Sequence, residues 1–325
     1  VREQARAITG EAADGGAVQL TAAQQMAMGM GSGDEAKAAL SAHAPKKAKS
    51  EARKARHAAL AKALSQLRAS VSAMERARLL GAGIVTTPAG RGELAIPAIK
   101  GVGGGILRFV DDASGLTNWC DVDFRPVEAA PPETGVGLQN IDHLAQTMKY
   151  GDMLTWTLFY TSILDAEKVS MVDVVDPGGL VRSRAIQNVS GDLRITLNGA
   201  ENLDTLAGQF IDRTFGAAVQ HLAFGCEDIF VTAEALAARG FEALAISPNY
   251  YEDLGARFGL EEAFLQRLQA SKILCDEDAG GRYFQLYSRQ RTSEVFFEIV
   301  QRDGGYDGYG AANAPFRISA QKRHP

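Results

Sequence analysis

A repeated pattern of helix, glycine turn and strand constrains the fold of this 325-residue chain more than any other feature. Residues 73–88, AMERARLLGAGIVTTP, are typical of a helix end, a turn at Gly81 and a strand rich in valine and threonine. Residues 232–247, TAEALAARGFEALAIS, repeat this pattern around Gly240. Each copy leads into a later apolar strand, GGGILRFV or GRYFQLYS. Such a recurrence indicates duplicated α+β units rather than one continuous sheet.

Two further segments resemble each other and begin two such units. IDHLAQT, residues 141–147, precedes the helix-like WTLFYTSIL, and VQHLAFG, residues 219–225, precedes the second copy of the repeat. The sequence therefore predicts tandem βαβββ units. We expect an alanine-rich basic appendage at residues 1–73, disordered or helical, a partial domain at 74–130, and a C-terminal catalytic domain of two units at 131–325.

The appendage is set apart by its composition. The first aromatic residue of the chain is Phe109, and residues 1–73 are mostly small, polar or charged, which cannot supply a packed core. Between Lys46 and Arg68, eight basic residues accompany a single acid, Glu51, in an alanine-rich context of high helix propensity. A solvated helix is favoured over a nucleic-acid-binding arm.

The overall composition excludes several classes of protein. A net charge of -5 with 22% charged and 46% hydrophobic residues is ordinary for a soluble protein and does not indicate a nucleic-acid partner. No apolar run reaches membrane-spanning length, and the first residues lack the apolar core of a secretory signal, so we expect a cytoplasmic protein. The three cysteines are far apart and form no CxxC motif, so they indicate reduced, structural residues.

Two of the five histidines occupy the same place in successive units. His143 lies in IDHLAQT and His221 lies in VQHLAFG. Because side chains alternate along a strand, each histidine is predicted to share a face with the apolar residues two positions away, which are Ile141 and Ala145 in one strand and Val219 and Ala223 in the other. A single strand histidine is usually a core residue, but two at equivalent positions indicate a shared role.

A buried acid completes this set. Glu298 lies between Phe297 and Ile299 in VFFEIVQR, a strand that otherwise has core composition. A buried carboxylate needs a cation or a proton. His143 and His221 are 78 residues apart, and Glu298 follows His221 by 77, about one unit each. Convergence of two imidazoles and one carboxylate predicts a metal site that leaves positions open for a substrate and dioxygen.

Two features near the C-terminus predict the surroundings of this site. Gln285 shares an inward face with Tyr283 and Tyr287, and the short link RQRT makes its strand the neighbour of the Glu298 strand. A neutral donor beside a metal suits a keto or carboxylate oxygen of a chelating substrate, although a cross-strand hydrogen bond to backbone is an alternative. The glycine-rich segment GGYDGYGAAN, residues 304–313, is typical of a loop over a cavity.

Residues 74–318 resemble the 4-hydroxyphenylpyruvate dioxygenases of the vicinal-oxygen-chelate superfamily. The resemblance is carried, in order, by GELAIPAIKGVGGGILRFVD, GLQNIDHLA, AAVQHLAF, FQLYS, FFEIVQR and GYGAAN. It implies an α+β fold of tandem βαβββ vicinal-oxygen-chelate modules, similar to the glyoxalase, bleomycin-resistance and dihydroxybiphenyl-dioxygenase proteins. In that fold, curved mixed sheets form an open barrel around a metal.

The resemblance also implies a cofactor, a reaction and a set of site residues. Fe(II), or alternatively Mg, Mn or Co as a divalent ion, would be bound by His143, His221 and Glu298. A 2-oxo acid would chelate the metal, dioxygen would react, CO2 would leave, and the aromatic ring would be hydroxylated to homogentisate in aromatic amino acid catabolism. The family's polar substrate-binding positions match Ser183, Asn198, Gln285 and Asn313, with a catalytic role for Gln285. The expected partners are a small-molecule acid and dioxygen, with no nucleic acid and no membrane, and a homo-oligomer is compatible with the sequence.

The chain departs from that family at two places. It has TLAG at residues 205–208 where the family has a glutamine-bearing SQIQ, and Ala314 where a phenylalanine follows the pocket asparagine. SPNYYEDLGARFGLEEAFLQRL and GGYDGYGAANAPFR are more similar to the C-terminal half of bacterial two-part 3-dehydroshikimate dehydratases, in which an isomerase-like barrel comes first. Residues 1–73 do not supply the strands of such a barrel. The alternatives are therefore a module of an enzyme that converts 3-dehydroshikimate to protocatechuate in quinate and shikimate catabolism, or a degenerate metal- or ligand-binding module.

Overall fold

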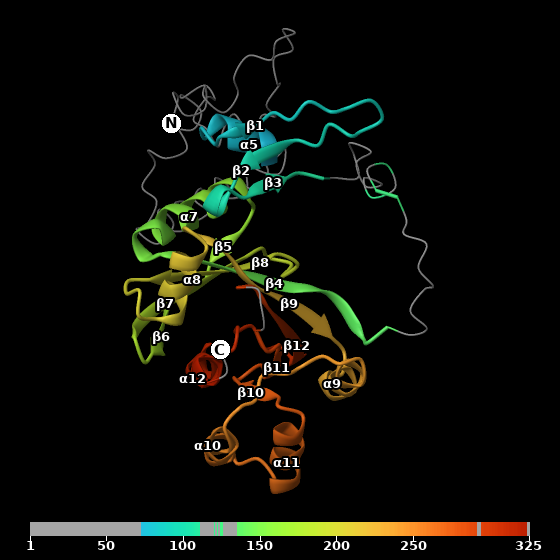
Figure 1. The fold of residues 1–325 in the computed structure, drawn as a ribbon, viewed down its shortest axis with the longest axis vertical. Coiled ribbons are helices and arrows are strands. Elements are labelled where there is room, and N and C mark those ends of the chain that lie inside the picture. The colour runs from blue at the N-terminus through green and yellow to red at the C-terminus, as the bar shows by residue number, and fades with distance from the viewer. Residues whose placement is uncertain are drawn as a thin grey trace, which may run out of the picture.

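The computed structural model describes residues 73–110, 120, 122, 124–125, 135–290 and 294–323. The predicted appendage of residues 1–73 therefore lies outside the described residues, apart from Ala73. Figure 1 shows a small N-terminal piece against one side of a large sheet, with the last helices on the opposite side. Among the described residues, no helix has the length and apolar character needed to cross a membrane.

The first complete unit contains a strand, a helix and three further strands, with a short strand β5 after the helix. Its elements are β4 (Leu138–Lys149), α7 (Tyr150–Ile163), β5 (Glu167–Lys168), β6 (Val172–Asp176), β7 (Gly179–Gln187) and β8 (Arg194–Ala200). Strand β8 pairs parallel with β4 and antiparallel with β7. The first and last strands of the unit are thus neighbours.

The second unit repeats this arrangement after helix α8 (Leu206–Arg213). Its elements are β9 (Ala218–Cys226), α9 (Ile229–Ala238), β10 (Leu274–Glu277), β11 (Gly281–Tyr287) and β12 (Phe296–Gly304), with helices α10 (Pro248–Phe258) and α11 (Glu262–Ala270) inserted before β10. Strand β12 pairs parallel with β9 and antiparallel with β11. The predicted neighbourhood of the Gln285 and Glu298 strands is confirmed.

One nine-stranded mixed sheet joins the two units. Its strand order is β10-β11-β12-β9-β4-β8-β7-β5, with β6 also paired to β7. The first strands of the two units, β4 and β9, pair antiparallel at its centre, so the units are related by an approximate twofold axis. The sheet curves into a half-barrel (Figure 1). The predicted α+β fold of tandem βαβββ vicinal-oxygen-chelate modules is confirmed.

The N-terminal piece packs against the first unit. It comprises helix α5 (Ala73–Leu79) and the antiparallel strands β1 (Ile84–Val85), β2 (Ala98–Lys100) and β3 (Ile106–Arg108), with a 3₁₀ turn at Val102–Gly104. Buried Ala77 and Ile99 contact Ile163 of α7. The helix, glycine turn and strand predicted at this position are all present.

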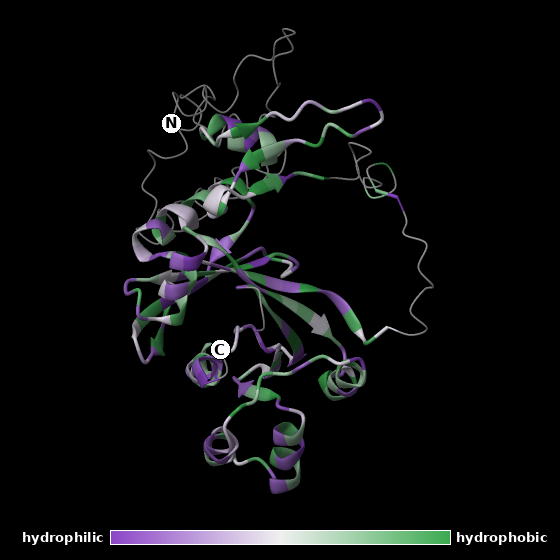
Figure 2. Cartoon of the chain, in the orientation of Figure 1, coloured by the Kyte–Doolittle hydropathy of each residue, from purple (hydrophilic) through white to green (hydrophobic). Residues whose placement is uncertain are grey.

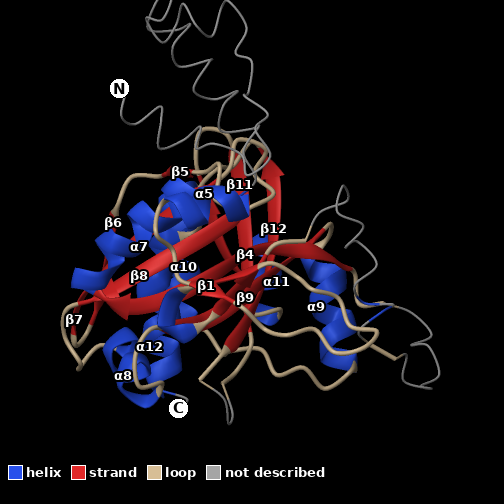
Figure 3. Cartoon of the chain, turned by 90° about the horizontal axis from the view of Figure 1, so that it is seen from above, coloured by secondary structure: helices blue, strands red, loops and turns tan. Residues whose placement is uncertain are grey.

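Each unit has its own apolar core on the helix-covered face of the sheet. In the first unit, side chains of α7 such as Met153 and Tyr160 pack on Leu197 of β8. In the second, α9, α10 and α11 cover strands β10 to β12, and Figure 2 shows hydrophilic and hydrophobic stretches on both α9 and α11. The last helix, α12 (Ala314–Arg323), lies beside α8 (Figure 3), where Ile318 packs with Ile211. Helix α12 therefore covers the open end of the half-barrel beside the first unit.

Two local predictions from the sequence are wrong. Ile141 does not face inward with His143 but is 56% exposed, because β4 carries irregular register between Ile141 and His143 and the alternation of faces is broken there. The segment after Gly240 does not form a strand; only an isolated bridge joins Ala243 to Ser288. The segment still lies beside the end of β11, where the backbone NH of Leu244 donates to the Tyr287 carbonyl at 2.8 Å.

Candidate metal centre

The pairing of the two central strands brings both histidines to one face of the sheet. In the β4–β9 ladder, His143 lies opposite Ala223, and His221 lies opposite Ala145. Because the strands are antiparallel and the two histidines hold equivalent places, each lies diagonally across from the other. Ala145 and Ala223, both fully buried, leave room between the rings.

Glu298 reaches the same place through the next ladder. Strand β12 runs parallel to β9 and sets Glu298 opposite Ala223, so that His143, Ala223 and Glu298 form a row across three strands. Residues with a common register on adjacent strands project to the same face. His143 and Glu298 are 155 positions apart in sequence but only two strands apart in the sheet.

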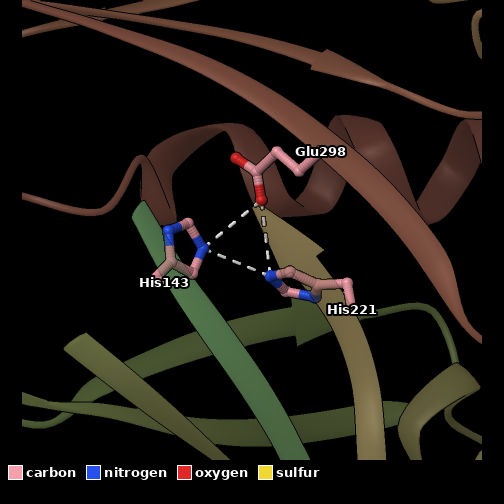
Figure 4. Close-up of side chains that lie close together, drawn as sticks. All are labelled: His143, His221 and Glu298. Carbon is pink, nitrogen blue, oxygen red and sulfur yellow. Dashed lines mark hydrogen bonds and ion pairs between the residues drawn. The ribbon is translucent and has the colours of Figure 1, made fainter. Parts of the chain in front are cut away.

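The three side chains converge, as Figure 4 shows. His143 Nε2 lies 3.3 Å from His221 Nε2 and 3.4 Å from Glu298 Oε2, and His221 Nε2 lies 3.3 Å from the same Glu298 oxygen. All three residues are buried. Two ligand atoms bound to one metal at right angles lie about 3 Å apart when each bond is about 2.1 Å. The nearly equilateral triangle therefore suits one face of a metal coordination sphere.

His143 is oriented by an ion pair between Asp142 and Arg302. Its Nδ1 lies 2.8 Å from Asp142 Oδ1, and Asp142 also accepts hydrogen bonds from Arg302 Nε at 2.8 Å and Nη2 at 3.0 Å. Burial by itself would lower the pKa of His143, but hydrogen bonds to Asp142 and Glu298, with the charges of both, raise it to about 9. A carboxylate on Nδ1 directs Nε2 of His143 at the centre of the triangle and strengthens it as a ligand.

His221 has a different environment. Its ring stacks on Phe296 at a centroid distance of 4.9 Å, and its buried Nδ1 has no hydrogen-bond partner among the described residues. Burial lowers the pKa of His221 to about 3; Glu298 opposes this shift, while the positive charges of His143 and Arg317 add to it. The imidazole is therefore neutral, which is the state that binds a metal.

Glu298 is held by a chain of neutral donors. Gln285 Nε2 donates to Glu298 Oε1 at 2.9 Å and to the Tyr287 hydroxyl at 2.7 Å, and Asn313 Nδ2 donates to Gln285 Oε1 at 2.7 Å. Burial would raise the pKa of Glu298, but hydrogen bonding to His143, the charges of both histidines and the Gln285 bond lower it to about 2. Glu298 is thus an anion with one oxygen fixed by Gln285 and the other directed at the histidines.

A cavity opens on the remaining side of the triad. Ser183 and Asn198, predicted as substrate-binding residues, line it, and Ser183 Oγ donates to Asn198 Oδ1 at 2.8 Å. The Asn198 amide nitrogen has no partner within the described part of the chain, so it can donate to a ligand. Gln285 and Asn313 do not line this cavity; the structure places them behind Glu298.

The glycine-rich segment and both departures from the family pattern border the cavity. Tyr309 and Gly310 lie over it, which agrees with the predicted position of that loop. Leu206 of the TLAG segment and Ala314 line it as well. The substitutions therefore change the wall of the cavity and not the triad.

The sequence analysis missed Asp142 and Arg302. An acid directly before a strand histidine was the available signal for Asp142, because IDH places two polar residues inside an apolar strand. Arg302 lies 160 residues away from Asp142, and the bond forms only because β4 and β12 flank β9 in the folded sheet.

Family models match two parts of the chain. Residues 37–125 match the N-terminal model of hydroxyphenylpyruvate dioxygenase, and this match begins within the segment that the sequence analysis assigned to an appendage. Residues 140–282 match the glyoxalase, bleomycin resistance protein and dioxygenase superfamily. The second match includes His143 and His221.

Two kinds of enzyme have sequences similar to this chain. The chain is 37% identical over 249 residues to a 3-dehydroshikimate dehydratase of Pseudomonas aeruginosa, which covers 76% of the chain but 39% of the relative. It is 33% identical over 253 residues to a 4-hydroxyphenylpyruvate dioxygenase of Pseudomonas sp. (strain P.J. 874), covering 75% of the chain and 70% of the relative. The chain thus spans less than half of the first relative and most of the second.

A solved structure agrees with both relatives. A fusion protein of a xylose isomerase-like TIM barrel and a 4-hydroxyphenylpyruvate dioxygenase has a TM-score of 0.64 and 34% sequence identity to the chain. The match covers 78% of this chain and 40% of the fusion protein. The family models, the dioxygenase relative and the solved structure all agree with the fold of the chain. The chain therefore belongs to the 4-hydroxyphenylpyruvate dioxygenase family of the vicinal-oxygen-chelate superfamily.

Proposed function

We propose that the chain binds one Fe(II) ion through His143, His221 and Glu298 and uses it as a dioxygenase acting on an aromatic 2-oxo acid. The observation that carries the proposal is the triangle of ligand atoms, 3.3 to 3.4 Å on each side, that faces a cavity. Two imidazoles and one carboxylate are the ligand set typical of non-haem Fe(II) oxygenases. Mg, Mn or Co as a divalent ion are the alternatives for the same ligands.

The residues around the triad would hold the metal ligands in place and contact the substrate. Bound Fe(II) would supply a Lewis-acidic centre that orients a chelating acid and reacts with dioxygen. Asp142 keeps His143 in the tautomer that presents Nε2, and Gln285 keeps one oxygen of Glu298 out of the centre. Apolar side chains of Val174, Val181 and Ile318 line the cavity, and Asn198 would offer an amide donor to the substrate.

The test combines binding with turnover. Adding 4-hydroxyphenylpyruvate to the Fe(II)-loaded protein without oxygen is expected to give a weak visible charge-transfer band, and admitting air is expected to consume oxygen and release CO2. The control is His221→Ala, which loses one of the three proposed ligands and is expected to show neither signal. No oxygen uptake with any 2-oxo acid tried would refute the dioxygenase activity.

A second candidate function is a module of a 3-dehydroshikimate dehydratase. It is supported by 37% identity to two dehydratases, of which the chain covers 39% and 37%, and by Ala314 and Leu206 on the cavity wall. A smaller residue at 314 weakens the grip on a phenol ring. We expect the complete gene product to dehydrate 3-dehydroshikimate to protocatechuate and this chain alone not to. Dehydration by neither protein would contradict this candidate.

A further inference from the structure

The proposed metal site assigns no role to Arg317, a cation in the wall of the cavity. It lies on α12, is half-buried, and is the one arginine or lysine among the described residues that line the cavity. The other acid in the wall besides Glu298 is Asp176, and its carboxylate already accepts from Lys322 Nζ at 2.6 Å and from two backbone amides. Asp176 is therefore not a partner for Arg317.

The contacts of Arg317 leave most of its donors free. Its Nη1 donates to Gln321 Oε1 at 2.6 Å, and its guanidinium lies 5.3 Å from the Phe296 ring centroid and 5.6 Å from the Tyr287 ring centroid. No carboxylate pairs with it in the described part of the chain. A guanidinium has five N–H donors in a fork that matches a carboxylate. A half-buried cation with a single amide partner is therefore equipped to take an anion.

Arg317 is one aromatic ring away from the metal ligands. Phe296, which the guanidinium faces, stacks on His221 at 4.9 Å, and Tyr287 lies opposite Glu298 in the β11–β12 ladder. Ala314, one helical turn before Arg317, is too small to cover the guanidinium from the cavity. Arg317 and the three proposed metal ligands line the same cavity, so one ligand can contact both.

We propose that Arg317 binds a carboxylate of the ligand at the end away from the metal. The inference rests on the proposed metal centre and names a ligand class for it: acids with two adjacent oxygens that chelate the metal and a carboxylate across the ring. This class agrees with the second candidate function rather than the first, because 4-hydroxyphenylpyruvate has a phenol group at the end away from its chelating oxygens. An acid that chelates only through its own carboxylate leaves Arg317 without a partner. Arg317 is therefore a specificity-determining residue for ring acids with a remote carboxylate.

The test compares two ligands that differ only in that carboxylate. Calorimetry measures the affinity of 3,4-dihydroxybenzoate and of catechol for the Co(II)-loaded protein. Wild type is expected to prefer the acid about tenfold or more, the effect of a charge-assisted hydrogen bond. Arg317→Met is expected to lose this preference with its catechol affinity unchanged, and Arg317→Lys to keep part of it. Arg257→Met, on the outer helix α10, is the matched control and keeps both affinities.

The outcomes separate this inference from the metal centre itself. An equal affinity of wild type for the two ligands, no binding of either, or a preference that survives in Arg317→Met overturns the role of Arg317. Cobalt content per chain is measured in the same samples, and a protein that retains no metal refutes the metal centre independently. Thermal unfolding of Arg317→Met checks that the cavity wall is intact; if this variant is unfolded, the Arg317→Lys ligand preference decides.

Discussion

At the scale of single residues, Asp142 orients the proposed ligand His143 and neutralises the charge of the partly buried Arg302. It holds His143 Nδ1 on one side and Arg302 on the other. Burial opposes ionisation, but these partners keep the pKa of Asp142 well below its usual range. We expect Asp142→Asn to weaken metal affinity about 10- to 100-fold, since removing the outer partner of a ligating histidine has this effect.

The same substitution is expected to lower the free energy of unfolding by about 3 kcal/mol or more, because Arg302 is left buried without its counter-charge. Chelator competition measures the affinity and urea denaturation the stability. Asp253→Asn is the control, since the Asp253–Arg257 pair on α10 is partly exposed and contributes less than about 1 kcal/mol. Equal losses in the two variants would refute the special position of Asp142.

A direct test of the ligand set also belongs at this scale. His221→Ala removes one of three proposed ligands and is expected to reduce bound metal to near background, measured as metal content after gel filtration. His57→Ala, in the segment outside the described residues, is expected to retain wild-type content. If both variants keep the same amount of metal, the assignment of His221 as a ligand is wrong.

At the scale of elements, the loop between β12 and α12 borders the cavity and also packs against Gln285. Gly310 has a left-handed backbone with φ of 64°, and a Cβ added there would lie 2.3 Å from Gln285 Oε1. Gln285 is the residue that fixes Glu298. Gly310 is therefore required both by its backbone conformation and by the side chain packed beneath it.

A matched pair of variants separates these two causes. Gly259 ends α10 with φ of 63° but has nothing within 4 Å of an added Cβ. Gly259→Ala is expected to cost about 1 kcal/mol, the price of a left-handed alanine, and to leave metal affinity unchanged. Gly310→Ala is expected to cost more and to weaken metal binding as well, because Gln285 must move. Identical losses of stability and unchanged affinity in both would contradict the role of the Gly310–Gln285 contact.

At the scale of the whole molecule, the metal is expected to stabilise the fold, because its proposed ligands come from both units of the sheet. A ligand at a hundredfold excess over its Kd stabilises the folded state by about 2.7 kcal/mol. We expect Co(II) or Fe(II) to raise the Tm by about 5–10 °C and a chelator to reverse the change. Thermal scans of wild type and His221→Ala measure this. An unchanged Tm in wild type would favour a degenerate module.

The sequence alone determined the architecture and the candidate ligands. The two histidines occupy equivalent places in repeated strands, and Glu298 interrupts an apolar strand one unit later, so chemistry and spacing together predicted the convergence that the structure has. The pairing of β11 with β12 followed from a short hairpin link. Patterns that are local in sequence, or that repeat, can be predicted because strand geometry fixes what lies opposite them.

Only the tertiary structure decided which polar residues line the cavity and which lie behind the proposed metal ligands. Asp142 meets Arg302 across three strands, and Arg317 reaches the cavity because α12 packs beside α8; neither contact has a periodic or local signal in the chain. The sequence placed Gln285 and Asn313 with the substrate, whereas in the fold they stand behind Glu298. Side-chain packing and strand irregularities such as those of β4 decide which inward-facing side chain reaches the cavity. Both depend on contacts between residues that are distant in sequence.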